Sequence, residues 1–141
     1  EITAGHVGHA ANAVAQCVGQ VGVVNLDKTR VGEVRISDRE QFCCLHLDAR
    51  NHVNAMEIVS TGSLNASLVH PREVFKAAIL NNAASIILAH NHPSGDVTPS
   101  REDIELTRRM IQAGELMGIE VLDHIIVSTE RFLSMKEAGV F

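Results

Sequence analysis

The sequence contains no tryptophan and no tyrosine, so its four phenylalanines are its only aromatic residues. A platform of aromatic rings for stacking single-stranded nucleic acid is therefore poorly supplied. Basic residues are also few, because 12 Lys and Arg stand against 17 Asp and Glu and the net charge is −5. Phosphate contacts by Lys and Arg supply much of the affinity for duplex nucleic acid, so this balance counts against DNA binding by the domain.

Cysteine is scarce as well, with Cys17, Cys43 and Cys44 only, and no two of them form a C-x-x-C pair. The odd count and this spacing argue against a disulfide framework and against a thiolate zinc site. No basic and apolar leader opens the sequence, so we expect no signal peptide and a cytoplasmic, reducing location. No apolar stretch approaches the roughly 20 residues that span a bilayer, and we expect no membrane partner.

What is present is an ordinary globular composition over 141 residues, 45% of them hydrophobic and 21% charged. Histidine is frequent, with eight residues, and it is both the commonest metal ligand and the usual proton carrier near neutral pH. Strand and helix patterns alternate, which predicts an α/β domain. The predicted helices are 9–20, 71–82 and 100–118, and the predicted strands are 23–26, 34–36, 41–47, 51–60, 85–90, 119–122 and 124–128.

The most informative segment is His90-Asn91-His92, followed after seven residues by Ser100 and two residues later by Asp103. Residues two apart on an extended strand point to the same side, so His90 and His92 can bind one ion together. The loop that follows contains two prolines and a glycine and can return the next helix to the same place. Asp103, one turn into that helix, then supplies a carboxylate. Two imidazoles and one carboxylate leave a position for water, as in a catalytic zinc site.

Each half of this pattern also has a simpler explanation. A His-x-His pair can be a polar start of a loop. Ser100 and Asp103 can be a helix start, with serine as the N-cap and an acidic residue at the third helical position. The combination within one strand–loop–helix unit rarely arises by chance, however, and Ser100 can serve both purposes.

Four segments carry a resemblance to a known family: PREVF at 71–75, HNHPSG at 90–95, PSRED at 99–103 and DHII at 123–126. The His-x-His-x7-Ser-x2-Asp spacing is similar to the metal motif of the JAB/MPN (JAMM) metalloprotease superfamily. The four segments together resemble the bacterial RadC family over residues 38–141, and they leave 1–37 as a divergent N-terminal segment. The resemblance implies an α/β (α+β) JAB/MPN fold, a cytidine-deaminase-like mixed sheet flanked by helices.

The resemblance also implies an activity, that of a zinc-dependent metallohydrolase cleaving an amide bond, peptide or isopeptide, with a metal-activated water. His90, His92 and Asp103 are then the ligands of one Zn²⁺ per chain, with another divalent metal left open. Ser100 is implied to donate a hydrogen bond to the oxyanion that forms on the attacked carbonyl. The substrate is expected to be a protein or peptide.

The general base that the resemblance implies is Glu40, directly before the strand 41–47. A glutamate there would accept the proton of the water and pass it to the leaving amine. Glu33, Glu57 and Glu73 are alternative bases, and only the family register favours Glu40.

A second class of function is a non-catalytic or DNA-repair-associated RadC module. Every ligand type of the metal motif is present, which favours an enzyme. A local basic group, Arg101, Arg108 and Arg109, leaves some room for DNA. A zinc nucleobase deaminase needs H-x-E and P-C-x-x-C motifs, which are absent. An unpaired edge strand makes a homodimer a possible assembly.

Most other histidines are expected to be structural. For His124 we favour a packed, hydrogen-bonded role over that of a partner to a metal ligand. His70 precedes a proline and is expected to shape the start of a helix. His46 and His52 lie on predicted strands and are expected at the surface.

Overall fold

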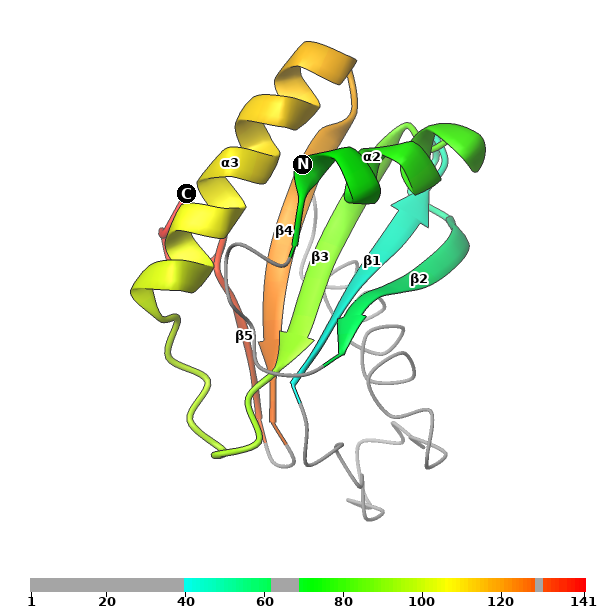
Figure 1. The fold of residues 1–141 in the computed structure, drawn as a ribbon. Coiled ribbons are helices and arrows are strands. Elements are labelled where there is room, and N and C mark those ends of the chain that lie inside the picture. The colour runs from blue at the N-terminus through cyan, green and yellow to red at the C-terminus, as the bar shows by residue number, and fades with distance from the viewer. Residues whose placement is uncertain (1–39, 62–68, 129–130) are drawn as a thin grey trace.

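The computed structural model describes residues 40–61, 69–128 and 131–141 (Figure 1). Within these ranges a five-stranded sheet carries two helices on one face. The predicted helix at 9–20, the predicted strands at 23–26 and 34–36, and the predicted boundary at residue 37 lie outside the described residues. The elements in chain order are β1 (Gln41–Leu47), β2 (Val53–Thr61), α2 (Pro71–Leu80), β3 (Ser85–Asn91), α3 (Arg101–Met117), β4 (Glu120–Val127) and β5 (Phe132–Ser134).

The strands lie in the order β2-β1-β3-β4-β5. Strands β3 and β4 are parallel and are connected through α3, whereas the other neighbouring pairs are antiparallel. A parallel pair needs a crossover of a dozen or more residues, and α3 with its flanking loops supplies it. The mixed sheet flanked by helices confirms the predicted α+β class.

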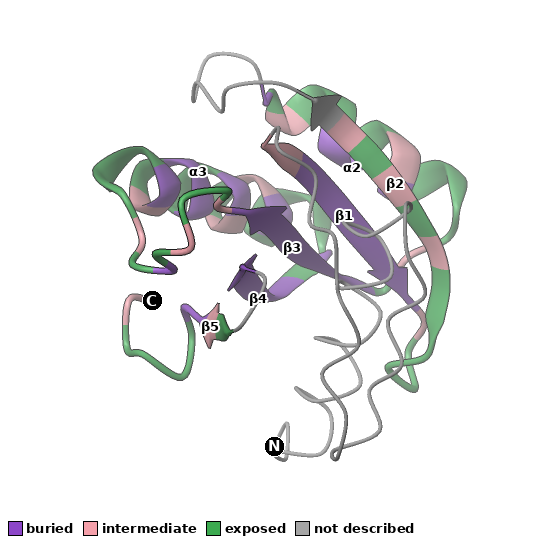
Figure 2. Cartoon of the chain, turned by 90° about the horizontal axis from the view of Figure 1, so that it is seen from below, coloured by how far each residue is buried: buried purple, intermediate pink, exposed green. Residues whose placement is uncertain are grey.

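The main core lies between the sheet and the helices. Strands β1 and β3 are buried along nearly their whole length, while β2 at the edge exposes several residues (Figure 2). Central strands covered on both faces read as continuous apolar runs, and this explains QFCCLHL and SIILAHN. The buried apolar side chains between the sheet and the helices are Phe42, Cys44, Val69, Val74, Phe75, Ala78, Ile86, Leu88, Leu106, Met110, Ile119 and Val121.

The hairpin between β1 and β2 forms where the sequence predicts it, but β2 begins two residues later than expected. The Asp48 carboxylate accepts hydrogen bonds from the backbone N–H groups of Arg50 and His52, at 2.8 and 2.9 Å. Asn51 has a φ of 63°. A left-handed residue cannot belong to a strand, so the turn extends through Asn51.

The two predicted strands at 119–122 and 124–128 are wrong, because the structure has the single strand β4. Ile86 pairs with Val121, but its neighbour Ile87 pairs with Asp123, so Leu122 is an extra residue in the ladder. The apparent break at Asp123 is a buried carboxylate that accepts a hydrogen bond from the Ser134 hydroxyl at 2.5 Å. After this bulge His124 faces the helices, as Val121 does before it.

The expectation that His46 lies at the surface is also wrong. Its side chain is fully buried on the helix-covered face of β1, where its Nδ1 lies 3.0 Å from Asn81 Nδ2 at the end of α2. The strand pattern could not show that α2 covers this position. His52 is exposed, as expected. His70 caps α2, and its Nδ1 accepts a hydrogen bond from the Arg72 backbone N–H at 3.2 Å.

Helix α3 has a defined stop at each end. Ser100 is its N-cap, and Gly118 ends it with a φ of 69°, as a left-handed glycine commonly does. Near this end Gly114 packs directly against the chain that leads into β4. A Cβ at Gly114 would lie 2.3 Å from the Ile119 carbonyl oxygen. None of the helices in the described ranges has the length and apolarity to cross a membrane.

Candidate metal centre

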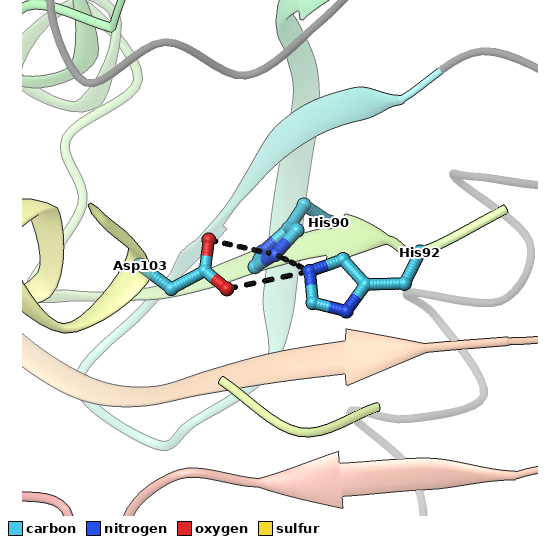
Figure 3. A group of neighbouring side chains, drawn as sticks. All are labelled: His90, His92 and Asp103. Carbon is cyan, nitrogen blue, oxygen red and sulfur yellow. Dashed lines mark hydrogen bonds and ion pairs between the residues drawn. The ribbon is translucent and has the colours of Figure 1, made fainter. Parts of the chain in front are cut away.

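The alternation of β3 aims its last helix-facing side chain at the start of α3. Ile86 and Leu88 pack into the core beneath the helices, and His90 is the next residue on that face. His92 follows directly after the strand, and Asp103 stands in the first turn of α3. The three side chains point toward one another at this end of the sheet (Figure 3). His90 and Asp103 are buried, and His92 is partly exposed.

The donor atoms of the three residues have the spacing of a metal site. His90 Nε2 lies 2.9 Å from His92 Nε2 and 3.1 Å from Asp103 Oδ1. His92 Nε2 lies 3.3 Å from Asp103 Oδ2. Bonds of about 2.0–2.1 Å in a tetrahedral zinc site separate the donors by roughly 3.3 Å. The three residues therefore fit one metal ion of this size and could hold it.

The loop after β3 orients the His92 ring. His92 Nδ1 lies 2.7 Å from the Asp96 carbonyl oxygen, which can only accept, so Nδ1 carries a proton and donates it. The lone pair of neutral His92 is then on Nε2, which faces Asp103. The loop turns back through Gly95, whose φ is +88° and whose N–H donates to the His92 carbonyl oxygen at 3.1 Å.

A capping box fixes the Asp103 carboxylate. The Ser100 backbone N–H donates to Asp103 Oδ2 at 2.8 Å, and Ser100 Oγ accepts from the Asp103 backbone N–H at 3.1 Å. The helix-start interpretation of this pair is thus correct. Ser100 is exposed, and the cap uses only a lone pair of its hydroxyl, so this contact does not use the hydroxyl proton.

The charges at the centre shift in the direction expected of a cation site. Burial alone would raise the pKa of the Asp103 carboxyl, but contacts with His90 and His92 outweigh burial and hold that pKa well below its usual value. The hydrogen bond to Asp103 raises the pKa of His92, against the lowering effect of burial. An ionised carboxylate thus faces two imidazoles in a largely buried place, and it stabilises positive charge there.

Glu40 lies near the same centre. Phe42 pairs with His90 in the antiparallel ladder of β1 and β3, Glu40 directly precedes β1, and His92 directly follows β3. The start of β1 is fastened to β3, because the Gln41 backbone N–H donates to Asn91 Oδ1 at 2.6 Å. The Glu40 carboxylate is among the charges that raise the pKa of His92.

The alternative bases are placed differently. Glu57 lies on the edge strand β2, opposite Cys44, and its charge acts on His46. Glu73 lies in the first turn of α2. Glu33 lies outside the described residues.

Two further buried side chains adjoin the centre. His124 Nε2 lies 2.7 Å from His90 Nδ1, and His124 Nδ1 lies 2.6 Å from Thr107 Oγ1. Both side chains are almost fully buried, and burial keeps the pKa of His124 well below its ordinary value. His124 is packed and hydrogen-bonded, as favoured from the sequence, and its hydrogen-bond partner is the candidate ligand His90. Thr107 was not among the residues that the sequence pointed to. Thr107 follows Asp103 by four residues, and residues at this spacing share a helix face, so the sequence contained a signal that Thr107 lies near the centre.

A mixed sheet with a His-x-His strand end that meets an aspartate on the next helix defines a JAB-type domain. The family model described as the RadC-like JAB domain matches residues 22–140, and the chain belongs to this family. Similar relatives are UPF0758 proteins of Desulforamulus reducens, 58% identical over 108 residues, and Bacillus cereus, 54% identical over 112 residues. These matches cover 77% and 79% of this chain but 48% and 50% of the relatives, so the chain spans about half the length of the curated relatives it matches.

Proposed function

We propose that this domain is a zinc-dependent hydrolase that cleaves an amide bond, peptide or isopeptide, in a protein or peptide substrate. The observation that carries the proposal is the convergence of His90 Nε2, His92 Nε2 and Asp103 carboxylate oxygens, all within 4.8 Å of one another. Two imidazoles and one carboxylate are the donor set of catalytic zinc sites, which keep a position for water. Membership of the RadC-like JAB family supports the same chemistry.

His90, His92 and Asp103 would hold the ion. When bound, Zn²⁺ would supply an acidified water, whose pKa is lowered to about 7, and would polarise a carbonyl. Glu40, directly before β1 and close enough for its charge to act on His92, would accept a proton from the attacking water and deliver it to the leaving amine. The Ser100 hydroxyl donates a hydrogen bond to the carbonyl oxygen as negative charge develops on it.

Metal binding is tested on the whole chain. The protein is stripped with a chelator, reloaded with Zn²⁺, dialysed and analysed for metal content. We expect one Zn²⁺ per chain for the wild type and a large loss of occupancy for Asp103→Ala. Asp96→Ala, which alters an exposed carboxylate four residues from His92, is the control and should retain the metal. Full occupancy in Asp103→Ala would refute the ligand assignment.

Amide cleavage is tested with the zinc-loaded protein on a mixed peptide library and on isopeptide-linked peptides, read by mass spectrometry. Glu40→Gln and Ser100→Ala should keep the zinc and lose cleavage, by about 10²- to 10³-fold for a lost oxyanion donor. Glu57→Gln is the matched control and should cleave like the wild type. Zinc binding without cleavage of any amide would favour the alternative, a non-catalytic metal-binding module.

A further inference from the structure

The site is backed by a chain of hydrogen bonds whose direction can be worked out from one end. The Thr107 hydroxyl lies 2.6 Å from the Asp103 backbone carbonyl oxygen, which can only accept, so the hydroxyl donates its single proton there. Thr107 Oγ1 must therefore accept from His124 Nδ1, 2.6 Å away, and His124 carries its proton on Nδ1.

The position of the proton on His124 determines the tautomer of His90. With its proton on Nδ1, neutral His124 has a lone pair on Nε2. The contact of 2.7 Å with His90 Nδ1 requires that His90 donates from Nδ1. The lone pair of His90 is then on Nε2, the atom that lies 3.1 Å from Asp103 Oδ1.

We propose that His124 and Thr107 are positioning residues of the metal centre, which hold His90 in the tautomer and orientation that present Nε2 to the ion. This inference rests on the proposed metal site. The chain starts at the backbone of the ligand Asp103 and ends on the ring of the ligand His90, so it also fixes the spacing between α3 and β3. Histidine ligands that donate their other N–H to an outer partner are better oriented and more basic.

The two side chains also contact an aromatic ring and a sulfur atom. The His124 ring stands edge-on to Phe42, with ring centroids 5.6 Å apart, and Phe42 also stacks on His90 at 6.3 Å. Thr107 Oγ1 also lies 3.8 Å from the Met135 sulfur, which is a weak acceptor. The rings are thereby held in place by an apolar wall.

The first test uses the wild-type protein without metal. Long-range ¹H–¹⁵N NMR correlations at mildly alkaline pH report which ring nitrogen of each histidine carries the proton. We expect His90 and His124 both protonated on Nδ1. Protonation of either ring on Nε2 instead of Nδ1 would reverse the hydrogen bonds and overturn the proposal, whether or not the protein binds zinc.

The second test measures zinc affinity by competition with a chromogenic chelator, and the visible spectrum of the Co²⁺-loaded protein. Thr107→Val removes the hydroxyl with little change of shape, and Thr107→Ser restores it. His124→Leu removes both ring hydrogen bonds. We expect about 10- to 100-fold weaker zinc binding and an altered Co²⁺ spectrum for His124→Leu and Thr107→Val. Thr107→Ser should bind like the wild type.

A control separates positioning from loss of a buried histidine. His46→Leu removes a fully buried imidazole on β1 that none of the ligand contacts involves, and it should leave zinc affinity and the Co²⁺ spectrum unchanged. Each variant is compared as folded protein by circular dichroism. Wild-type affinity in both folded Thr107→Val and folded His124→Leu would refute the positioning role while leaving the metal site intact. Absence of zinc binding by the wild type would instead refute the proposed function.

Discussion

Replacing Gly114 with alanine tests how tightly α3 is packed against the chain leading into β4. An added Cβ would lie 2.3 Å from the Ile119 carbonyl oxygen, closer than real Cβ contacts come. The clashing atom belongs to the backbone and cannot rotate away. The Gly114 carbonyl oxygen also accepts hydrogen bonds from the N–H groups of Gly118 and Ile119, the latter at 2.9 Å, so this stretch is held in place.

Helix propensity and packing predict opposite signs for the change in stability of Gly114→Ala. Alanine in a helix interior is favoured over glycine by about 1 kcal/mol, so propensity alone predicts stabilisation. Overpacking typically costs about 1–3 kcal/mol and more when backbone must move. Because the clash is with backbone, we take the upper part of this range, about 2–3 kcal/mol, and expect a net loss of about 1–2 kcal/mol in the free energy of unfolding. For a domain of this size each kcal/mol lowers Tm by about 3–6 °C.

The assay is urea denaturation and thermal melting of the metal-free protein, followed by circular dichroism. Gln112→Ala, at an exposed position of the same helix, is the control and should change stability by less than about 0.5 kcal/mol. If Gly114→Ala were as stable as the wild type or more stable, the close approach of α3 to Ile119 would be refuted.

Three further outcomes follow from the structure. Zn²⁺ at 100 times its Kd should stabilise the wild type by about 2.7 kcal/mol in thermal melts, and Asp103→Asn should remove most of this gain. Burial lowers the pKa of His46, so below the ordinary pKa the unfolded chain binds a proton that the folded one resists. Acidification from neutral pH should therefore destabilise the wild type more steeply than His46→Gln, by up to about 1.4 kcal/mol per pH unit in denaturation curves. Asp123→Asn should lose about 1.5–3 kcal/mol in urea denaturation, because the buried carboxylate accepts from the Ser134 hydroxyl and the Lys136 N–H; a wild-type midpoint would contradict this.

The parts of the fold that follow from local signals could be predicted. Ser100 and Gly118 bound α3, and Pro71 opens α2, because helix ends depend on backbone groups within one turn. The meeting of His90, His92 and Asp103 could be anticipated for a similar reason. Strand alternation, a short loop and one helical turn decide it, and all three lie within 14 consecutive residues.

The parts of the fold that depend on contacts between distant segments could not be predicted from the sequence. His46 is buried where α2 covers β1, and the sequence of β1 contains no signal for that contact. The contact of His124 with His90 depends on the parallel pairing of β3 and β4. The hydroxyl of Thr107 contacts His124 because α3 packs against β4. For the same reason the sequence alone suggests a break at Asp123 inside β4, because its hydrogen-bond partner Ser134 lies 11 residues away.

The extra residue Leu122 makes the length of β4 as decisive as its composition. In an unbulged strand the side chains sharing a face with Val121 would be Asp123 and Ile125, and the imidazole of His124 would lie in the opposite layer. Deletion of Leu122 would thus restore a regular ladder and keep His124 on the face of His90, whereas insertion of one residue between Asp123 and His124 would turn the imidazole to the opposite layer although every polar side chain around the centre remained encoded. Substitution scans hold chain length constant and are blind to this dependence, which only single-residue deletions and insertions in β4 can reveal.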